Sequence, residues 1–195
     1  SELSLEMLEN FNPCFVLDLT ATPKKESNII SYVDAVQLKN EHMVKLPVIV
    51  YNRDSQSEVL IDAIDLRNKL EEIADAEYAK TGKYIRPIAL FQAQPKGKED
   101  ATTFEKLRDK LVDAGIPADQ IAIRTADVNE LKNVELMSPN CPIRYIITVN
   151  ALKEGWDCPF AYILASLANK TSQVDVEQIL GRILRLPHTS QHTQS

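Results

Sequence analysis

The sequence predicts an α/β domain built on a mostly parallel sheet with helices on both faces. From Leu46 onward, apolar runs typical of buried strands alternate with amphipathic helical segments. These runs are continuously apolar, as is usual for parallel strands that are covered on both sides. In such sheets ligands bind at the carboxyl ends of the strands, so functional residues are expected in the loops that follow them.

Six segments are expected to form strands. Residues 15–19 are apolar, and Pro23 biases Thr22 away from helix, so a strand that ends in a turn is predicted. Residues 46–51 are β-branched and apolar, which favours a second strand. Further buried strands are expected at residues 87–91, 121–123, 144–149 and 161–165.

Three segments are expected to form helices. The longest covers residues 59–80 and ends at Gly82, while a second at 102–114 ends at Gly115. A last helix is predicted at residues 174–184. The buried face of the first helix is expected to contain Leu60, Ile64, Leu66, Leu70, Ile73 and Ala74, which recur at three- and four-residue steps.

The composition is that of a soluble globular protein, with 44% hydrophobic and 26% charged residues in 195. No apolar run approaches the roughly 18 residues of a membrane helix, and the N-terminus does not have the pattern of a signal peptide. The three cysteines lack metal-ligand spacing, so reduced thiols, no metal site and a cytoplasmic location are expected. A formal charge of −6 by itself argues against a nucleic-acid partner, although a local basic groove is compatible with an acidic total.

The segment QILGRILR carries the strongest chemical pattern. On a helix Gln178, Arg182 and Arg185 share one face, because they stand at positions i, i+4 and i+7. Two guanidinium groups on one stripe suit a polyphosphate, since each can donate two parallel hydrogen bonds. The spacing alone fits equally well with a solvated helix whose arginines meet surface carboxylates.

Two loops carry weaker patterns. Gly155 allows close approach to the backbone, and Asp157 could accept hydrogen bonds from a sugar hydroxyl; a turn with Asp as helix cap is the alternative. Thr20 and Thr22 lie in a strand-end turn, where their hydroxyl groups could relay hydrogen bonds between neighbouring loops. A simple turn is the alternative there.

In combination these segments resemble motifs III, V and VI of superfamily two helicases. The resemblance is closest to the helicase (restriction) subunit of type III restriction enzymes, in which phrases like LDLTATP, LKEGWD and QILGRILR recur. It extends from Phe15 to Pro187, although only in outline between Ile29 and Tyr84, and Trp156 favours this group over other helicase branches. It implies a RecA-like fold of the P-loop NTPase class and an ATP-dependent DNA motor.

The resemblance also implies roles for individual residues. Arg182 and Arg185 would be arginine fingers, and Gln178 would contact the γ-phosphate or the attacking water. Gly155 and Asp157 would contact the ribose and help to couple the two motor domains. The residues expected to couple the ATP state to DNA binding are Thr20 and Thr22, and those expected to contact the DNA backbone are Gln92, Gln94, Thr148 and Asn150.

The expected domain layout follows from missing motifs. The sequence contains neither a GxxxxGK[ST] loop nor an Asp-Glu pair before a helix that would hold Mg²⁺. Residues 1–40 are therefore expected to be a remnant of the first motor domain, 41–187 the second RecA-like domain and 188–195 a disordered tail. ATP and Mg²⁺ would be held mainly by the missing first domain, and the chain alone is expected to lack ATPase activity.

The expected partners are DNA, the first motor domain and a methyltransferase subunit, with no membrane. A DNA repair helicase or another superfamily two translocase is the main alternative, and a non-catalytic interaction module on the same fold is another. A small-molecule enzyme on a flavodoxin-like or dinucleotide-binding sheet would need a Gly-rich first turn, and the sequence has no GxGxxG.

Overall fold

The computed structural model describes residues 53–95, 102–149 and 158–167, together with some isolated residues before position 50. The chain divides into two compact units, Ser1–Tyr32 and Val33–Ser195, and every helix and strand described below belongs to the second. The expected strand at 15–19 and the expected helix at 174–184 lie outside the described residues.

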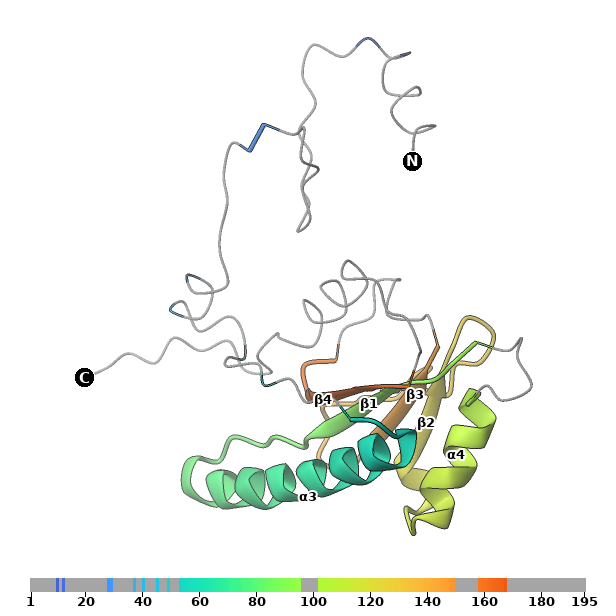
Figure 1. The fold of residues 1–195 in the computed structure, drawn as a ribbon. Coiled ribbons are helices and arrows are strands. Elements are labelled where there is room, and N and C mark those ends of the chain that lie inside the picture. The colour runs from blue at the N-terminus through green and yellow to red at the C-terminus, as the bar shows by residue number, and fades with distance from the viewer. Residues whose placement is uncertain are drawn as a thin grey trace. The chain divides into compact units, whose positions relative to one another are not determined.

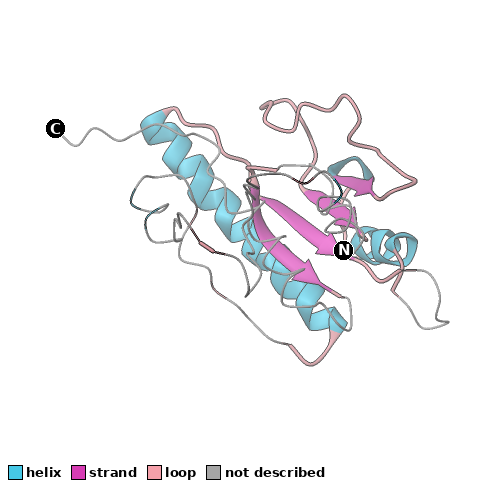
Figure 2. Cartoon of the chain, turned by 90° about the horizontal axis from the view of Figure 1, so that it is seen from above, coloured by secondary structure: helices cyan, strands magenta, loops and turns pink. Residues whose placement is uncertain are grey.

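Four parallel strands form a single sheet with the order β2-β3-β1-β4 (Figures 1 and 2). The inner strands are almost wholly buried and apolar, as a parallel sheet requires, whereas β4 alternates between buried and more exposed residues. The prediction of an α/β domain with a parallel sheet is thereby confirmed, and the arrangement is consistent with a RecA-like fold. The strands are β1 (Ile88–Gln92), β2 (Ile121–Arg124), β3 (Tyr145–Thr148) and β4 (Ala161–Ser166).

The helices begin and end at residues that the sequence marks clearly. Ser55 caps α3 by accepting a hydrogen bond from the backbone of Glu58, and Thr103 caps α4 in the same way. Gly82 and Gly115 follow the two helices with positive φ angles of 70° and 89°, which confirms both predicted ends. The described helices are α3 (Gln56–Thr81), α4 (Phe104–Asp113) and a short 3₁₀ turn, η1 (Ala118–Gln120).

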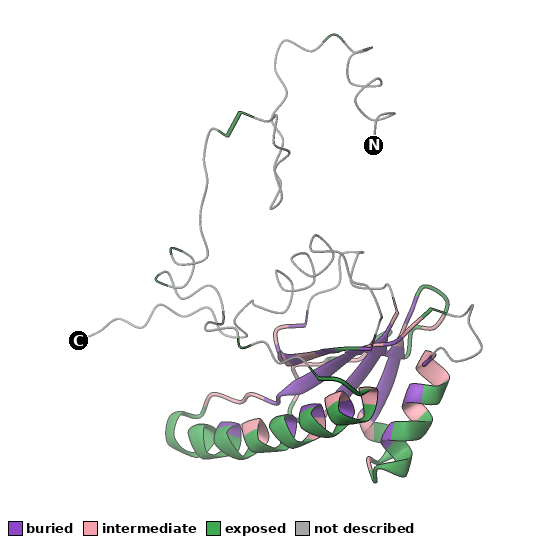
Figure 3. Ribbon diagram, in the orientation of Figure 1, coloured by how far each residue is buried: buried purple, intermediate pink, exposed green. Residues whose placement is uncertain are grey.

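Both described α-helices pack on one face of the sheet (Figure 1). The core between them and the strands is apolar; it includes Leu60, Ala63, Leu107, Leu111, Phe91, Ile123, Ile147 and Ala165. The opposite face packs against Phe160 and against apolar residues of the irregular segment 131–143, such as Leu131 and Ile143. The strands are purple in Figure 3, which marks them as the buried centre of the domain beside the two helices.

The predicted buried face of α3 is partly wrong. Leu66 and Ile73 were expected inside but are 38% and 64% exposed, whereas Arg67 is 3% exposed. The stripe that faces the sheet contains Leu60, Ala63, Arg67 and Ala74. Leu66 and Ile73 each precede a member of this stripe by one residue, which rotates them by about 100° around the helix axis.

Three further expectations are addressed in part. Of the strand predicted at residues 46–51 only Ile49 is described, and it is exposed and outside any strand. Cys141 and Cys158 are free thiols. Among the described residues, no helix combines the length and the apolar character that crossing a membrane requires.

Candidate polar site at the carboxyl edge of the sheet

A row of polar side chains crosses the sheet where its strands end. The strand register pairs Arg124 with Thr148, Thr148 with Gln92, and Gln92 with Ser166. Successive strand residues point to opposite faces, and the residue before each of these four packs on the helical side: Ile123, Ile147, Phe91 and Ala165. Arg124, Thr148, Gln92 and Ser166, called here the polar row, therefore share the face away from α3 and α4.

The members of the polar row differ in their surroundings. The Ser166 hydroxyl donates a hydrogen bond to Gln92 Oε1 at 3.0 Å, and Thr148 is only 1% exposed. Arg124 is partly exposed, and within the described ranges its guanidinium group makes no hydrogen bond or ion pair. A guanidinium without a carboxylate partner, beside an amide and hydroxyl groups, can bind an anion through two parallel hydrogen bonds.

Gln94 lies just beyond the end of β1, but its amide group is bound inside the domain. Its Nε2 donates to the Leu167 carbonyl at 2.9 Å, and its Oε1 accepts from the Thr102 backbone N–H at 2.9 Å. Its own backbone N–H donates to the Thr102 carbonyl at 2.9 Å. Gln94 therefore holds the two ends of the segment between β1 and α4 together.

The structure places three of the predicted site residues. Gln92 and Thr148, which the resemblance implied, lie side by side at the carboxyl edge, and Gln94 is two residues further along. Of these three residues, Thr148 is buried and the Gln94 amide is bound internally, whereas the Gln92 side chain is partly open to solvent. The predicted residues outside the described part of the chain are Thr20, Thr22, Asn150, Gly155, Asp157, Gln178, Arg182 and Arg185.

The sequence interpretation overlooked Arg124 and Ser166. Each directly follows a short apolar run, as Thr148 does, so the position of a polar residue at a strand end is a signal that could have found both. Gln56, whose Oε1 accepts a hydrogen bond from the Thr102 hydroxyl at 2.7 Å, was also overlooked. No sequence signal connects Gln56 with Thr102, because they lie 46 residues apart and meet only in the folded domain.

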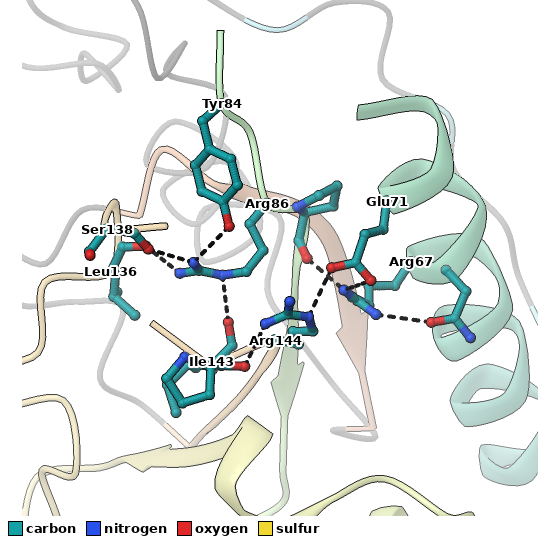
Figure 4. Close-up of polar contacts among 11 residues, drawn as sticks. Arg67, Glu71, Tyr84, Arg86, Leu136, Ser138, Ile143 and Arg144 are labelled. Carbon is teal, nitrogen blue, oxygen red and sulfur yellow. Dashed lines mark hydrogen bonds and ion pairs between the residues drawn. The ribbon is translucent and has the colours of Figure 1, made fainter. Parts of the chain in front are cut away.

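At the opposite, amino-terminal end of the strands, the fully buried Arg86 makes the polar contacts drawn in Figure 4. Its Nε donates to the Ile143 carbonyl at 2.9 Å, and its terminal nitrogens donate to the carbonyls of Ser138, at 2.8 Å, and Leu136. A further contact of 3.3 Å reaches the Tyr84 hydroxyl. Arg86 thus fixes the irregular segment 131–143 to the sheet by bonding to its backbone.

A second arginine cluster at this end centres on Glu71 (Figure 4). The Glu71 carboxylate forms an ion pair with Arg67 one helical turn away and another with Arg144 Nε at 2.8 Å. Arg67 also donates to the Pro87 carbonyl at 3.2 Å. Burial raises the pKa of the neighbouring Tyr145 hydroxyl, while the positive charge of Arg67 opposes that rise.

No protein-family model matches the chain, and no curated protein matches it significantly. Within the described residues, no three His, Cys, Asp or Glu side chains gather closely enough to hold a metal ion. The functional inference therefore depends on the fold and on the chemistry of the polar row.

Proposed function

We propose that the chain forms the second motor domain of an ATP-dependent DNA helicase or translocase, similar to the helicase subunit of type III restriction enzymes. In this proposal the polar row is part of the surface that binds the DNA backbone. The observation that supports it best is Arg124, a guanidinium without an internal partner in the described residues. It stands at the sheet edge where α/β proteins bind their ligands.

The polar row has groups that suit a phosphodiester. An arginine fork matches two phosphate oxygens, and an amide NH₂ such as that of Gln92, whose oxygen accepts from Ser166, can donate to phosphate and sugar oxygens. Such contacts give salt-sensitive binding that is largely independent of DNA sequence. Because the chain carries a formal charge of −6, only local contacts of this kind would attract DNA, and the domain alone should bind weakly.

ATP hydrolysis would also require the first motor domain. We propose that Arg182 and Arg185 contribute guanidinium groups from across a domain cleft, while the phosphates and Mg²⁺ are held mainly by the first motor domain. Contacts that exist only with ATP bound would then close the cleft. The 195-residue chain alone should show no ATP turnover. A Mg²⁺-dependent turnover lost in Arg185→Ala would contradict this division of labour.

DNA binding can be tested on the chain itself. A fluorescent single-stranded oligonucleotide is titrated at several salt concentrations with the unchanged protein and with Arg124→Gln. If Arg124 contacts a phosphate, Arg124→Gln should weaken binding for all sequences and reduce the slope of log affinity against log salt by about 1.

The matched control is Arg108→Gln, which removes the same charge from α4. Arg108 is 35% exposed and paired with Glu130 at 3.0 Å, so its loss should leave the salt slope nearly unchanged. An equal effect of both substitutions would mean that net charge and not the polar row determines binding. The absence of salt-dependent binding by the unchanged chain would overturn the proposed DNA surface.

A further inference from the structure

Four residues at the carboxyl edge form a closed ring of hydrogen bonds. Gln94 Nε2 and Gln56 Nε2 both donate to the Leu167 carbonyl, at 2.9 and 3.5 Å. The Thr102 hydroxyl donates to Gln56 Oε1 at 2.7 Å, and the Thr102 backbone N–H donates to Gln94 Oε1 at 2.9 Å. These four residues, called here the amide ring, come from the first turn of α3, the chain after β1, the approach to α4 and the chain after β4.

The amide ring is a well-satisfied polar structure. Thr102 and Leu167 are buried, and the two glutamine side chains are partly buried. Each glutamine uses its oxygen and one amide hydrogen within the ring. Buried polar networks whose members are all paired fix the geometry of the segments they join, because an unpaired member would be costly.

Two of the joined segments lead toward residues with proposed functions. The chain after β1 begins beside Gln92 on the polar row, and the Leu167 backbone N–H donates to the Gln92 carbonyl at 2.9 Å. The chain after β4 continues from Leu167 toward Arg182 and Arg185. Gln94 belongs to the first of these segments, and its side-chain amide is hydrogen-bonded to the second at the Leu167 carbonyl.

We propose that Gln94 is a positioning residue that couples DNA binding to ATP hydrolysis by holding the chain after β1 and the chain after β4 in a fixed relation. This inference rests on the proposed function, and it replaces direct phosphate contact by Gln94 with an indirect role. Gln94 would set the position of groups that touch DNA on one side and of the arginine-bearing segment on the other.

The structural part is tested by amide hydrogen exchange on the 195-residue chain, without DNA or ATP. Gln94→Glu keeps the acceptor for the Thr102 N–H but loses the donor to the Leu167 carbonyl. Exchange of the Leu167 amide should become about five- to tenfold faster while that of Thr102 changes little. Gln94→Ala should accelerate both. Unchanged exchange at Leu167 in both variants would overturn the positioning role.

The coupling part is tested by DNA-stimulated ATP hydrolysis of the chain joined to its first motor domain. Gln94→Glu should lower the DNA-stimulated kcat by about threefold to tenfold, while the DNA concentration for half-stimulation stays within about twofold. The matched variant Gln92→Glu makes the same chemical change on the polar row. It should mainly raise the DNA concentration required, because a carboxylate there repels phosphate.

The possible results separate the two proposals. If Gln94→Glu raises the DNA requirement and leaves kcat unchanged, the coupling role is wrong. If the joined protein shows no DNA-stimulated hydrolysis, the proposed function fails and the coupling role fails with it. The exchange experiment then still decides whether Gln94 positions the two segments.

Discussion

Arginine side chains are bonded differently at the two ends of the parallel strands. At the amino-terminal end Arg67, Arg86 and Arg144 are bonded to carbonyl groups of the domain, and Glu71 neutralises two of them. At the carboxyl end Arg124 has no partner of this kind among the described residues. The same side chain therefore serves the fold at one end and remains available to a ligand at the other.

This contrast separates stability from binding in a testable way. A buried guanidinium that satisfies backbone carbonyls should cost much when it is removed, whereas an unpartnered one should cost little. If the comparison is sound, substitutions at the amino-terminal end change the free energy of unfolding, and those on the polar row change mainly DNA binding.

The largest loss of stability is expected for Arg86→Ala. The substitution leaves the carbonyls of Leu136, Ser138 and Ile143 without their donor and opens a cavity in a fully buried site. A destabilisation of about 3–4 kcal/mol is expected in urea unfolding followed by circular dichroism. Arg108→Ala on the exposed face of α4 should cost less than about 1 kcal/mol. A loss below that of the control would show that the segment 131–143 does not depend on Arg86.

A smaller loss is expected for Glu71→Gln. The substitution leaves the buried Arg67 without its anion and weakens the contact of Arg144. We expect about 2 kcal/mol in the same unfolding assay, because Glu71 is partly exposed and the glutamine can still accept a hydrogen bond. The neighbouring Glu72→Gln, on the exposed side of α3, should be nearly neutral. Equal effects at both positions would contradict a special role for the ion pairs.

Alkaline pH should also lower the free energy of unfolding through Tyr145, which lies near Arg67 and Glu71 at the amino-terminal end of the strands. Burial raises its pKa above the ordinary value of 10.0. Below that value both the folded and the unfolded chain keep the proton, so the stability contribution is fully present. Above it the unfolded chain loses the proton first, and stability falls as the pH rises.

Tyr145→Phe should therefore reduce the difference in unfolding free energy between roughly pH 9 and pH 11, measured by urea titration. This range brackets the ordinary tyrosine pKa of about 10. Burial also raises the pKa of Tyr162, so part of the alkaline loss should remain in this variant. Adding Tyr162→Phe should remove a further part. An unchanged pH dependence in the double variant would mean that other groups cause the alkaline loss.

The sequence predicted the sheet well because its strands are marked by local chemistry. Continuous apolar runs located all four described strands within a few residues, and Gly82 and Gly115 located the helix ends. Which residues of α3 face the core was less predictable. Arg67 occupies a core position because Glu71 and the Pro87 carbonyl compensate it, and neither contact is visible in a helical pattern.

The site was predictable only in part. The resemblance implied Gln92, Gln94 and Thr148, and Gln92 and Thr148 do lie at strand ends, but the bonded state of Gln94 depends on Thr102 and Leu167, which the folded chain brings together. Arg124 after an apolar run looks like any surface arginine until the register places it beside Thr148. The structural arginines differ from Arg124 in their contacts with residues distant in sequence, and not in residue type.

The smallest effect on stability is expected for Arg124→Gln. No hydrogen bond or ion pair within the described residues is lost, and glutamine retains part of the aliphatic stem, so the change in unfolding free energy should be below about 0.5 kcal/mol. Arg144→Gln is the matched measurement at the other end, where contacts of 2.8 Å to Glu71 and 2.7 Å to the Pro142 carbonyl are lost. It should cost about 1–2 kcal/mol. If Arg124→Gln costs as much as Arg144→Gln, its guanidinium has a structural role, and the carboxyl edge is no more open to a ligand than the amino-terminal end.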